Sequence, residues 1–176
     1  MPDAPRYFVI RADDIEPFTH PLDPAYHSQH VLGHETTGRH DLLLNRGTVD
    51  PHQSLRGGNH PNNDEIYYAV AGEALVDLGG DPDDGTRSST YRLVPGTTVF
   101  IPAGVFHRLR NEGDEPFVLL TLWPQPAAAG ANPIHDERLE RWGTGFRLRN
   151  GRELVAGDGA ARVVVPEEGW DPLVAR

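Results

Sequence analysis

The most constraining feature of this sequence is a series of short β-prone segments, separated by turn residues, that fills residues 40–124. Residues 65–70 (EIYYAV) are rich in β-forming side chains, and residues 73–78 (EALVDL) alternate acidic and apolar side chains, as a half-buried strand does. Similar segments are predicted at residues 40–49, 91–94, 97–101, 105–110 and 116–123, with Gly and Pro in the turns. This regular succession predicts an all-β barrel or sandwich.

The regions on either side of this series predict less regular structure. Residues 1–39 are Pro-containing and irregular, with strand character only at residues 7–11, and we interpret them as an N-terminal arm on a barrel formed by residues 40–124. Residues 125–176 are predicted to form a C-terminal extension with one helix at residues 133–142 (PIHDERLERW). That helix is expected to act as a lid or a packing brace. Short strand-like pieces follow it at residues 145–149 and 162–165.

Composition excludes several classes of function. The formal net charge of -10 repels phosphate backbones, so we expect no nucleic-acid partner. Neither a basic patch nor a long apolar stretch predicts membrane contact, and the first eleven residues lack a signal-peptide pattern, so a cytoplasmic protein is expected. The chain has no Cys, and all 16 of its basic residues are Arg. Thiolate nucleophiles and Lys Schiff bases are therefore excluded.

Residues 96–111 (GTTVFIPAGVFHRLRN) have a spacing that carries chemical information. Five residues separate Gly96 from Pro102, and Gly104, His107 and Asn111 follow at fixed intervals. Pro102 and Gly104 predict a sharp corner between two strands. On the second of these strands, His107 and Asn111 share one face because side chains alternate with a period of two.

A second group of spaced residues lies upstream, where four residues separate His60 from Glu65 and six separate Glu65 from Gly72. Together the two segments resemble the two motifs of the cupin superfamily: the downstream motif matches at every defined position, and the upstream motif matches in its second half. The resemblance covers roughly residues 45–124. It implies a cupin-type double-stranded β-helix, or jelly-roll barrel, to which this chain adds a short C-terminal helix.

The resemblance also implies a metal site with His60, Glu65 and His107 as ligands. The family would use three His and one Glu, but the position of its first His is Gly58 here, and the first Gly of its motif is His52. Water would replace the missing donor, or His52 would do so if the loop that carries Gly58 folds back. Two His and one carboxylate are the donors of the facial triad of non-haem iron enzymes. One divalent ion is expected, Fe(II) before Mn, Ni, Co or Zn.

Tyr67 has the same strand parity as Glu65, so its side chain should point into the barrel. It is either a core aromatic residue or a phenol that orients a substrate or transfers a proton, and we select it as the candidate catalytic residue. Phe100, Leu109 and Leu119 are expected to give the interior a partly apolar lining for a small-molecule substrate.

The remaining polar residues are given ordinary roles. Asn111 is expected to hold a turn, and Arg108 and Arg110 should point outward, where packing or dimer contacts would use them. The acidic run at residues 81–84 lacks the spacing of a calcium loop and is interpreted as solvated. Six further histidines are interpreted as ordinary polar side chains: His20, His27, His30, His34, His40 and His135.

Three functions are compatible with this sequence. The first is a mononuclear metal-dependent enzyme acting on a small organic substrate, with an Fe(II) dioxygenase or other oxygenase preferred. The second is a non-redox isomerase, cyclase or lyase that uses the metal as a Lewis acid. The third is a non-catalytic small-molecule-binding cupin with a vestigial site. Because cupins often dimerise through barrel edges, and an edge strand needs covering, a homodimer is expected.

Overall fold

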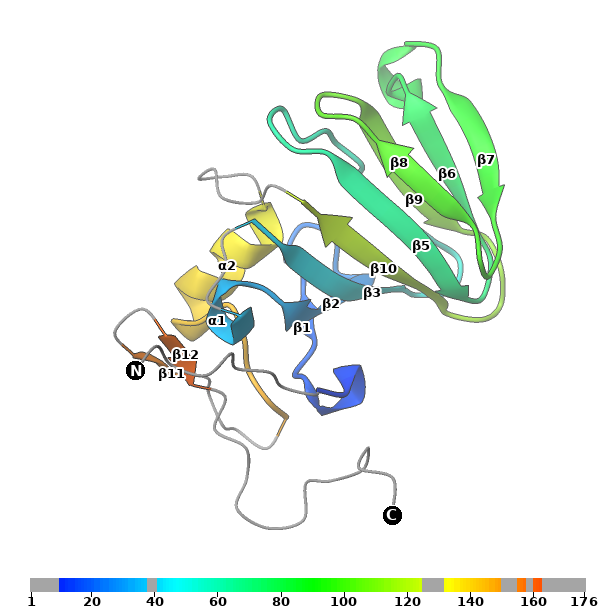
Figure 1. Ribbon diagram of the computed structural model, residues 1–176. Helices are drawn as coiled ribbons and strands as arrows, with labels where there is room; N and C mark the ends of the chain where they lie inside the picture. The colour runs from blue at the N-terminus through cyan, green and yellow to red at the C-terminus, as the bar shows by residue number, and fades with distance from the viewer. Residues whose placement is uncertain (1–9, 38–40, 125–131, 150–154, 158–159, 163–176) are drawn as a thin grey trace.

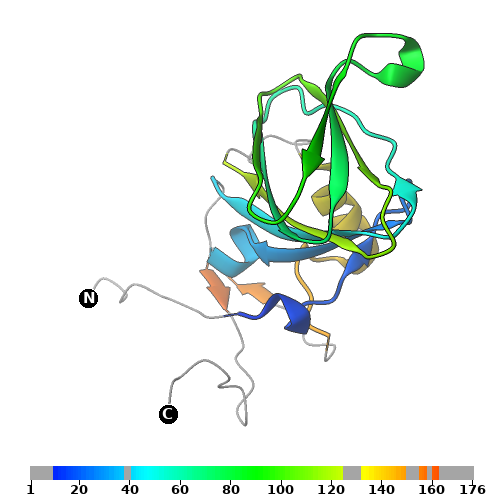
Figure 2. The same cartoon turned by 90° about the vertical axis from the view of Figure 1, so that its right-hand side faces the viewer.

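Two antiparallel sheets face each other in the computed structural model, which describes residues 10–37, 41–124, 132–149, 155–157 and 160–162 (Figures 1 and 2). The larger sheet has six strands in the order β1-β2-β3-β10-β5-β8, and the smaller has four in the order β4-β9-β6-β7. Many neighbouring strands are distant in the sequence, as β3 and β10 are. This exchange of strands between two sheets is the jelly-roll barrel that the sequence predicted.

The larger sheet consists of β1 (Phe18–Thr19), β2 (Tyr26–Leu32), β3 (Leu43–Val49), β5 (Glu65–Ala71), β8 (Thr98–Ile101) and β10 (Phe117–Trp123). The smaller sheet consists of β4 (Gln53–Ser54), β6 (Ala74–Gly79), β7 (Ser89–Leu93) and β9 (Phe106–Asn111). The other elements are helices α1 (His34–Thr37) and α2 (Pro133–Trp142), 3-10 turns η1 (Ala12–Asp14) and η2 (Pro82–Asp84), and a hairpin of β11 (Val155–Gly157) and β12 (Ala160–Arg162). Among the described residues, neither α-helix is both long and apolar enough to span a membrane.

The barrel core lies between the inner faces of the two sheets. Every second side chain is buried along β9 and along residues 65–69 of β5, and the same alternation runs through β3 and β10. The turn between β5 and β6 requires glycine, because Gly72 has a φ of 70° and a Cβ there would lie 2.4 Å from the carbonyl oxygen of Pro116. The core cluster consists of Tyr26, Val49, Tyr67, Ala69, Ala74, Val76, Leu93, Ile101, Leu109, Phe117 and Leu119.

The expectation of an irregular N-terminal arm is wrong for residues 18–32. Strand β2 pairs with β3 along nearly its whole length, and β1 pairs with β2. The segment escaped prediction because the inward positions of β2 carry polar residues, including Ser28 and His30, which are 1% and 2% exposed. The predicted strand at residues 7–11 lies partly outside the described residues, and Ile10 and Arg11 are not in a strand.

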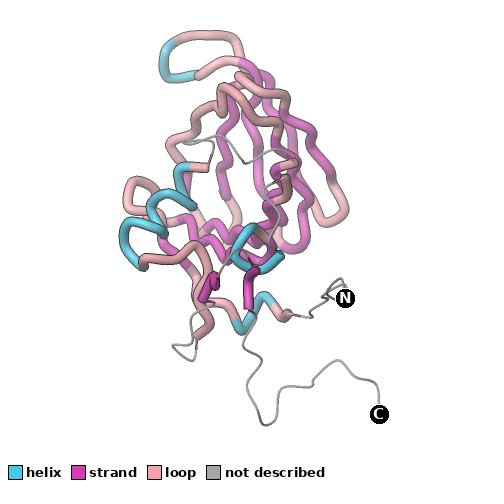
Figure 3. The backbone as a smooth tube through the Cα atoms, turned by 60° about the vertical axis from the view of Figure 1, so that its left-hand side comes forward, coloured by secondary structure: helices cyan, strands magenta, loops and turns pink. Residues whose placement is uncertain are grey.

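Helix α2 has the bounds that the sequence predicted, and its ends explain them. The Asn132 side chain accepts a hydrogen bond from the backbone N–H of His135, Pro133 occupies the first turn, and Gly143 ends the helix with a φ of 71°. The helix lies beside one end of the barrel (Figure 3). Its Trp142 ring meets the Phe18 ring edge-on at a centroid distance of 5.1 Å, and its Arg138 is fully buried.

The strand-like pieces predicted after α2 are only partly present. Residues 145–149 contribute a single bridge, between Leu148 and Ile15, where a strand was expected. Strand β12 ends at Arg162, and residues 163–165 of the predicted strand lie outside the described residues.

Candidate metal centre and pocket

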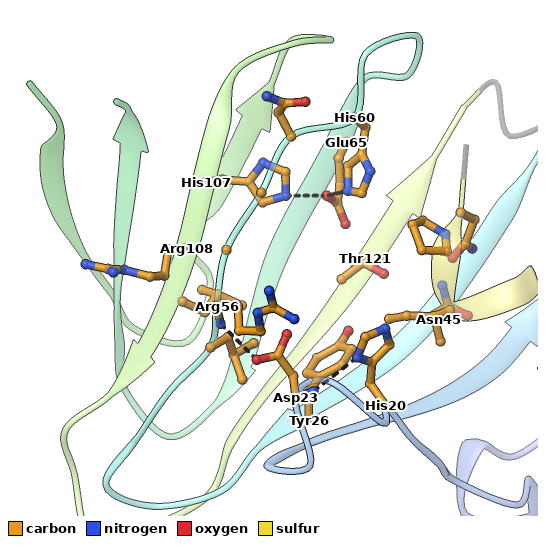
Figure 4. A pocket seen from close by; sticks show the side chains of 18 of the residues that line it. His20, Asp23, Tyr26, Asn45, Arg56, His60, Glu65, His107, Arg108 and Thr121 are labelled. Carbon is orange, nitrogen blue, oxygen red and sulfur yellow. Dashed lines mark hydrogen bonds and ion pairs between the residues drawn. The ribbon is translucent and has the colours of Figure 1, made fainter. Parts of the chain in front are cut away.

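The structure brings together the three residues that the sequence nominated as metal ligands, and we call His60, Glu65 and His107 the barrel cluster. Glu65 begins β5 in the larger sheet, His107 lies on β9 in the smaller sheet, and His60 comes from the loop between β4 and β5 (Figure 4). The nearest ligand atoms of all three lie within 4.8 Å of one another. Glu65 and His107 are 4% and 7% exposed, so the cluster sits at the inner wall of the barrel.

Backbone hydrogen bonds explain how a loop residue reaches this wall. Gly58 and His107 exchange two backbone bonds, at 2.9 and 3.1 Å, so the loop runs antiparallel to β9. The backbone N–H of Gly104 then donates to the carbonyl of His60 at 2.8 Å. The corner formed by Pro102 and Gly104 therefore fixes His60 as well as His107.

The outer contacts of the cluster orient its side chains. The Trp123 indole N–H donates to Oε1 of Glu65 at 2.8 Å, and the His60 ring packs on the Trp123 ring at a centroid distance of 4.2 Å. Nδ1 of His107 lies 3.1 Å from the carbonyl oxygen of Val105. A carbonyl only accepts hydrogen bonds, so Nδ1 carries the hydrogen and Nε2 of the neutral ring has a free lone pair.

That lone pair faces the carboxylate. Nε2 of His107 lies 3.2 Å and Nε2 of His60 lies 3.3 Å from Oε2 of Glu65, and this buried oxygen has no hydrogen-bond partner among the described residues. Electron pairs directed at one another at this separation repel unless a proton or a cation lies between them. Two imidazoles and a carboxylate are suitable donors for Fe, Mn, Ni, Co or Zn, so the residues present fit a divalent ion.

The protonation equilibria of the metal-free cluster reflect the same proximity. Burial raises the pKa of Glu65, but the two imidazoles outweigh it and hold the pKa of that carboxyl below its usual value. Burial lowers the pKa of His107, whereas the adjacent Glu65 raises it more, so the net shift is upward. The ionised Glu65 carboxylate thus favours a positive charge beside it, either a proton on an imidazole or a metal ion.

The barrel cluster forms one end of a pocket of about 360 Å³, a size suited to a small organic molecule. Tyr26, Asn45 and Thr121 form part of its wall beyond the cluster, and the side chain of Arg56 extends into the space between them and β9 (Figure 4). The start of α2 closes another side. The lining residues at the start of this helix are Asn132, Pro133 and Ile134.

Tyr67 lies where strand parity placed it, buried in the core and lining the pocket. Its ring meets the His107 ring edge-on at a centroid distance of 5.9 Å. Burial, followed by the negative charge of Glu65, raises the pKa of Tyr67 well above its ordinary value. The phenol is therefore a hydrogen-bond donor at neutral pH and not a base.

The expected apolar lining is only partly correct. Leu109 lines the pocket and Leu119 is in the core, but Phe100 is 59% exposed. Phe100 lies opposite Ile66 on β5, one residue out of phase with the inward positions Glu65 and Tyr67, so its side chain points away from the core.

Gly58 lies where the family has its first His ligand, and His52 does not replace that ligand. His52 is exposed and lies 3.0 Å from Asp114, so it does not fold back toward the cluster. A Cβ at Gly58 would meet no atom of the described residues within 4 Å, and Gly58 lines the pocket. The missing donor therefore leaves open space beside the cluster.

Two outward arginines and one asparagine have the roles that the sequence predicted. Arg108 and Arg110 both contact Asp77, at 3.2 and 3.0 Å, on the outer face of the smaller sheet. The Asn111 amide donates to the carbonyls of Val49 and Glu115 and accepts from Gly113 N–H, which fixes the turn after β9.

A second cluster of the same composition was missed, and we call His30, Glu35 and His135 the helix cluster. Its nearest ligand atoms also lie within 4.8 Å of one another. Nε2 of His135 is 2.7 Å from Oε1 of Glu35, and Nε2 of His30 is 3.5 Å from Oε2. Ordinary polar roles were expected for His30 and His135, and their proximity was not predicted. They are about 100 residues apart and have no motif spacing, so only the docking of α2 on β2 reveals them.

Comparison with known proteins agrees with this description. Residues 45–123 match the family model described as "Cupin domain". A glucose-6-phosphate isomerase of Thermococcus onnurineus is 36% identical over 88 residues, which are 49% of this chain and 45% of that protein. The chain thus spans less than half the length of that relative.

Two solved structures show the likeness of fold. A predicted oxalate decarboxylase of Thermotoga maritima has a TM-score of 0.57 at 21% identity, covering 67% of this chain and 99% of that one. The oxalate decarboxylase of Bacillus subtilis, described with Mn(II) centres, has a TM-score of 0.50 at 22% identity, covering 57% of this chain and 26% of that one.

Proposed function

Residues 45–123 form a cupin domain, and from this premise we propose that the chain is a metal-dependent enzyme that acts on a small organic molecule in the barrel pocket. His60, Glu65 and His107 would hold one divalent ion. The observation that carries the proposal is the unpartnered Oε2 of Glu65, which faces the Nε2 atoms of both histidines at 3.2 and 3.3 Å. Only a proton on one of the facing nitrogens or a bound cation can satisfy this oxygen, and leaving it unsatisfied would cost about 1 to 3 kcal/mol.

Non-redox isomerase chemistry is the form of this proposal that we prefer. The glucose-6-phosphate isomerases are matched across the barrel at up to 36% identity, which favours the alternative without O2. The bound ion would supply Lewis-acid polarisation of a carbonyl or enolate oxygen. The protein would orient the substrate: Tyr67, protonated at neutral pH, can donate a hydrogen bond, and Ile134 with Leu109 excludes water from one side of the pocket.

An Fe(II) dioxygenase is the second candidate, supported by one specific observation. The donor set is two histidines and one carboxylate, and the place of a fourth protein ligand at Gly58 is open. Such a facial set leaves adjacent coordination positions for a substrate and O2.

One pair of assays separates these candidates. Protein loaded in turn with Fe(II), Mn(II), Ni(II), Co(II) and Zn(II) is assayed for interconversion of fructose 6-phosphate and glucose 6-phosphate, and for O2 consumption with a panel of small organic acids and phenols. We expect isomerisation that is abolished in His107→Ala and unchanged in His52→Ala, without O2 uptake. O2 uptake that needs His107 would move the assignment to the dioxygenase. Failure of every preparation to bind metal would contradict both.

A further inference from the structure

A buried cation without a carboxylate partner lies behind the pocket wall. Arg138 of α2 is 0% exposed, and its guanidinium donates to Nδ1 of His30 at 3.3 Å, Oδ1 of Asn45 at 3.3 Å and Oγ of Ser28 at 2.7 Å. All three acceptors are neutral. Its Nε has no partner, and no ion pair joins it to a carboxylate among the residues the structure describes.

This guanidinium remains charged. Burial lowers the pKa of Arg138 to about 10, which still keeps it protonated at neutral pH. The Phe18 ring, 5.9 Å from its central carbon, gives partial compensation through a cation–π contact. Glu35 offsets part of its charge across the His30 ring, whose Nδ1 faces Arg138 and whose Nε2 lies 3.5 Å from Oε2 of Glu35. A buried charge left with neutral partners is costly unless another negative group approaches it.

The positive potential of Arg138 reaches the pocket through Asn45. Asn45 is 3% exposed and accepts a hydrogen bond from Arg138. It lines the pocket together with Tyr26 and Thr121. Burial, and to a smaller extent the negative charge of Glu65, raises the pKa of Tyr26 far above its ordinary value. Its hydroxyl therefore stays protonated and can donate a hydrogen bond. The wall therefore combines hydroxyl donors with a buried cation behind them.

A second cation enters the pocket from the opposite side. The Arg56 side chain extends toward Tyr26 and Thr121 (Figure 4). Asp23 is nearby and accepts from the Arg56 backbone N–H at 2.8 Å, so it offsets part of this charge. Behind Asn45, Arg138 has no direct carboxylate contact in the described part of the chain, and Glu35 reaches it only across the His30 ring.

We propose that the pocket recognises an anionic oxygen group of its substrate, a carboxylate or a phosphate, bound at Asn45, Tyr26 and Thr121 between Arg56 and the buried Arg138. The rest of the substrate then extends toward the barrel cluster. This names the substrate class for the proposed function and rests on it. Arg138 acts through Asn45 and is a positioning residue, whereas Arg56 contacts the anion.

Binding of small probes tests this without turnover. The full-length chain, as purified and again after chelation, is titrated with acetate, inorganic phosphate and acetamide while backbone and side-chain amide NMR signals are followed. Acetamide matches acetate in size but lacks its charge. We expect saturable shifts at Asn45 and Thr121 with at least one anion and none with acetamide. The anion that saturates at lower concentration identifies the carboxylate or the phosphate as the recognised group.

Substitutions then separate charge from structure. Asn45→Asp places a carboxylate against Arg138 and should weaken anion binding at least tenfold while the melting temperature stays equal or rises. Arg138→Lys should keep anion binding, and Arg56→Gln should weaken it severalfold, whereas Arg92→Gln, whose partner Glu73 is on the surface, should not change it.

Undiminished anion binding in Asn45→Asp, or equal shifts with acetate and acetamide, would overturn the inference. Because these readouts persist after chelation, they stand even if the metal-dependent function fails. Conversely, a metal-loaded isomerase with no anion preference would overturn only this inference.

Discussion

The barrel cluster and the helix cluster have the same composition, two histidines around one glutamate, but differ in what surrounds them. In the barrel cluster, Nδ1 of His107 faces the carbonyl of Val105, which leaves Nε2 free to bind a cation. In the helix cluster, Nδ1 of His30 accepts from Arg138, so the hydrogen of the neutral ring lies on Nε2 and points at Glu35. The guanidinium already supplies positive charge there.

The two clusters also differ in how closely other atoms surround them. A Cβ at Gly33 would lie 2.1 Å from Nε2 of His30, and a Cβ at Gly145 would lie 2.1 Å from Oε1 of Glu35. The helix cluster is thus closely covered by backbone, whereas the barrel cluster opens on the pocket beside Gly58. Ligand identity alone does not define a metal site: hydrogen bonds to the outer nitrogen and the space around the donors decide between a metal centre and a structural clamp.

Removal of the Arg138 guanidinium beside the helix cluster should have the largest effect on the stability of the fold. We expect Arg138→Met to destabilise the fold by roughly 3 kcal/mol or more, because three buried acceptors lose a charged donor. Urea unfolding of the variant and the parent measures this. Arg141→Met, on the same helix and paired with Glu137 at 3.4 Å on the surface, is the control and should change stability little. Equal effects of the two substitutions would show that Arg138 does not clamp α2 to the barrel.

A pair of glycine substitutions probes the difference in space. Gly33→Ala should cost between about 1 and 3 kcal/mol, because the added methyl group overlaps the His30 ring. Gly58→Ala should leave stability unchanged, since nothing lies within 4 Å of the added atom. Thermal denaturation of both variants and of the parent protein measures these changes in stability. A destabilised Gly58→Ala together with a tolerated Gly33→Ala would reverse our description of the packed and the open cluster.

His30 and His107, one from each cluster, should also make opposite contributions to the pH dependence of stability in metal-free protein. Burial and Arg138 lower the pKa of His30 to about 3, from an ordinary value of 6.5. The unfolded chain therefore binds a proton that the folded chain does not, and stability falls as pH drops from about 6.5 to about 3, by up to about 1.4 kcal/mol per pH unit. The pKa of His107 is raised, so its contribution is present at low pH and is lost as pH rises through that value.

His30→Gln isolates the first of these effects, because Gln keeps an acceptor for Arg138 but does not titrate. Relative to the parent, the variant should gain stability between pH 6.5 and pH 4.5, measured by denaturant unfolding at each pH. Parallel stability profiles for the two proteins would mean that His30 is not held neutral in the fold.

The same contrast explains how far the sequence could predict the structure. Strands β5 to β10 were predictable because their turns carry Gly and Pro and their inward positions follow a period of two. The barrel cluster was predicted from the resemblance of its residues to the cupin motifs. Strand β2 was not predicted, since Ser28 and His30 occupy its inward positions to meet Arg138. The helix cluster depends on a contact between β2 and α2 that no local spacing encodes. The expected homodimer stays a prediction.

The most direct test of this account is the metal content of three proteins purified without an affinity tag: the parent chain, His107→Ala and His135→Ala. We predict about one equivalent of divalent metal in the parent, its loss in His107→Ala and its retention in His135→Ala. Absence of metal from the parent even after reloading would contradict the account. So would metal that survives the loss of His107 and disappears with His135.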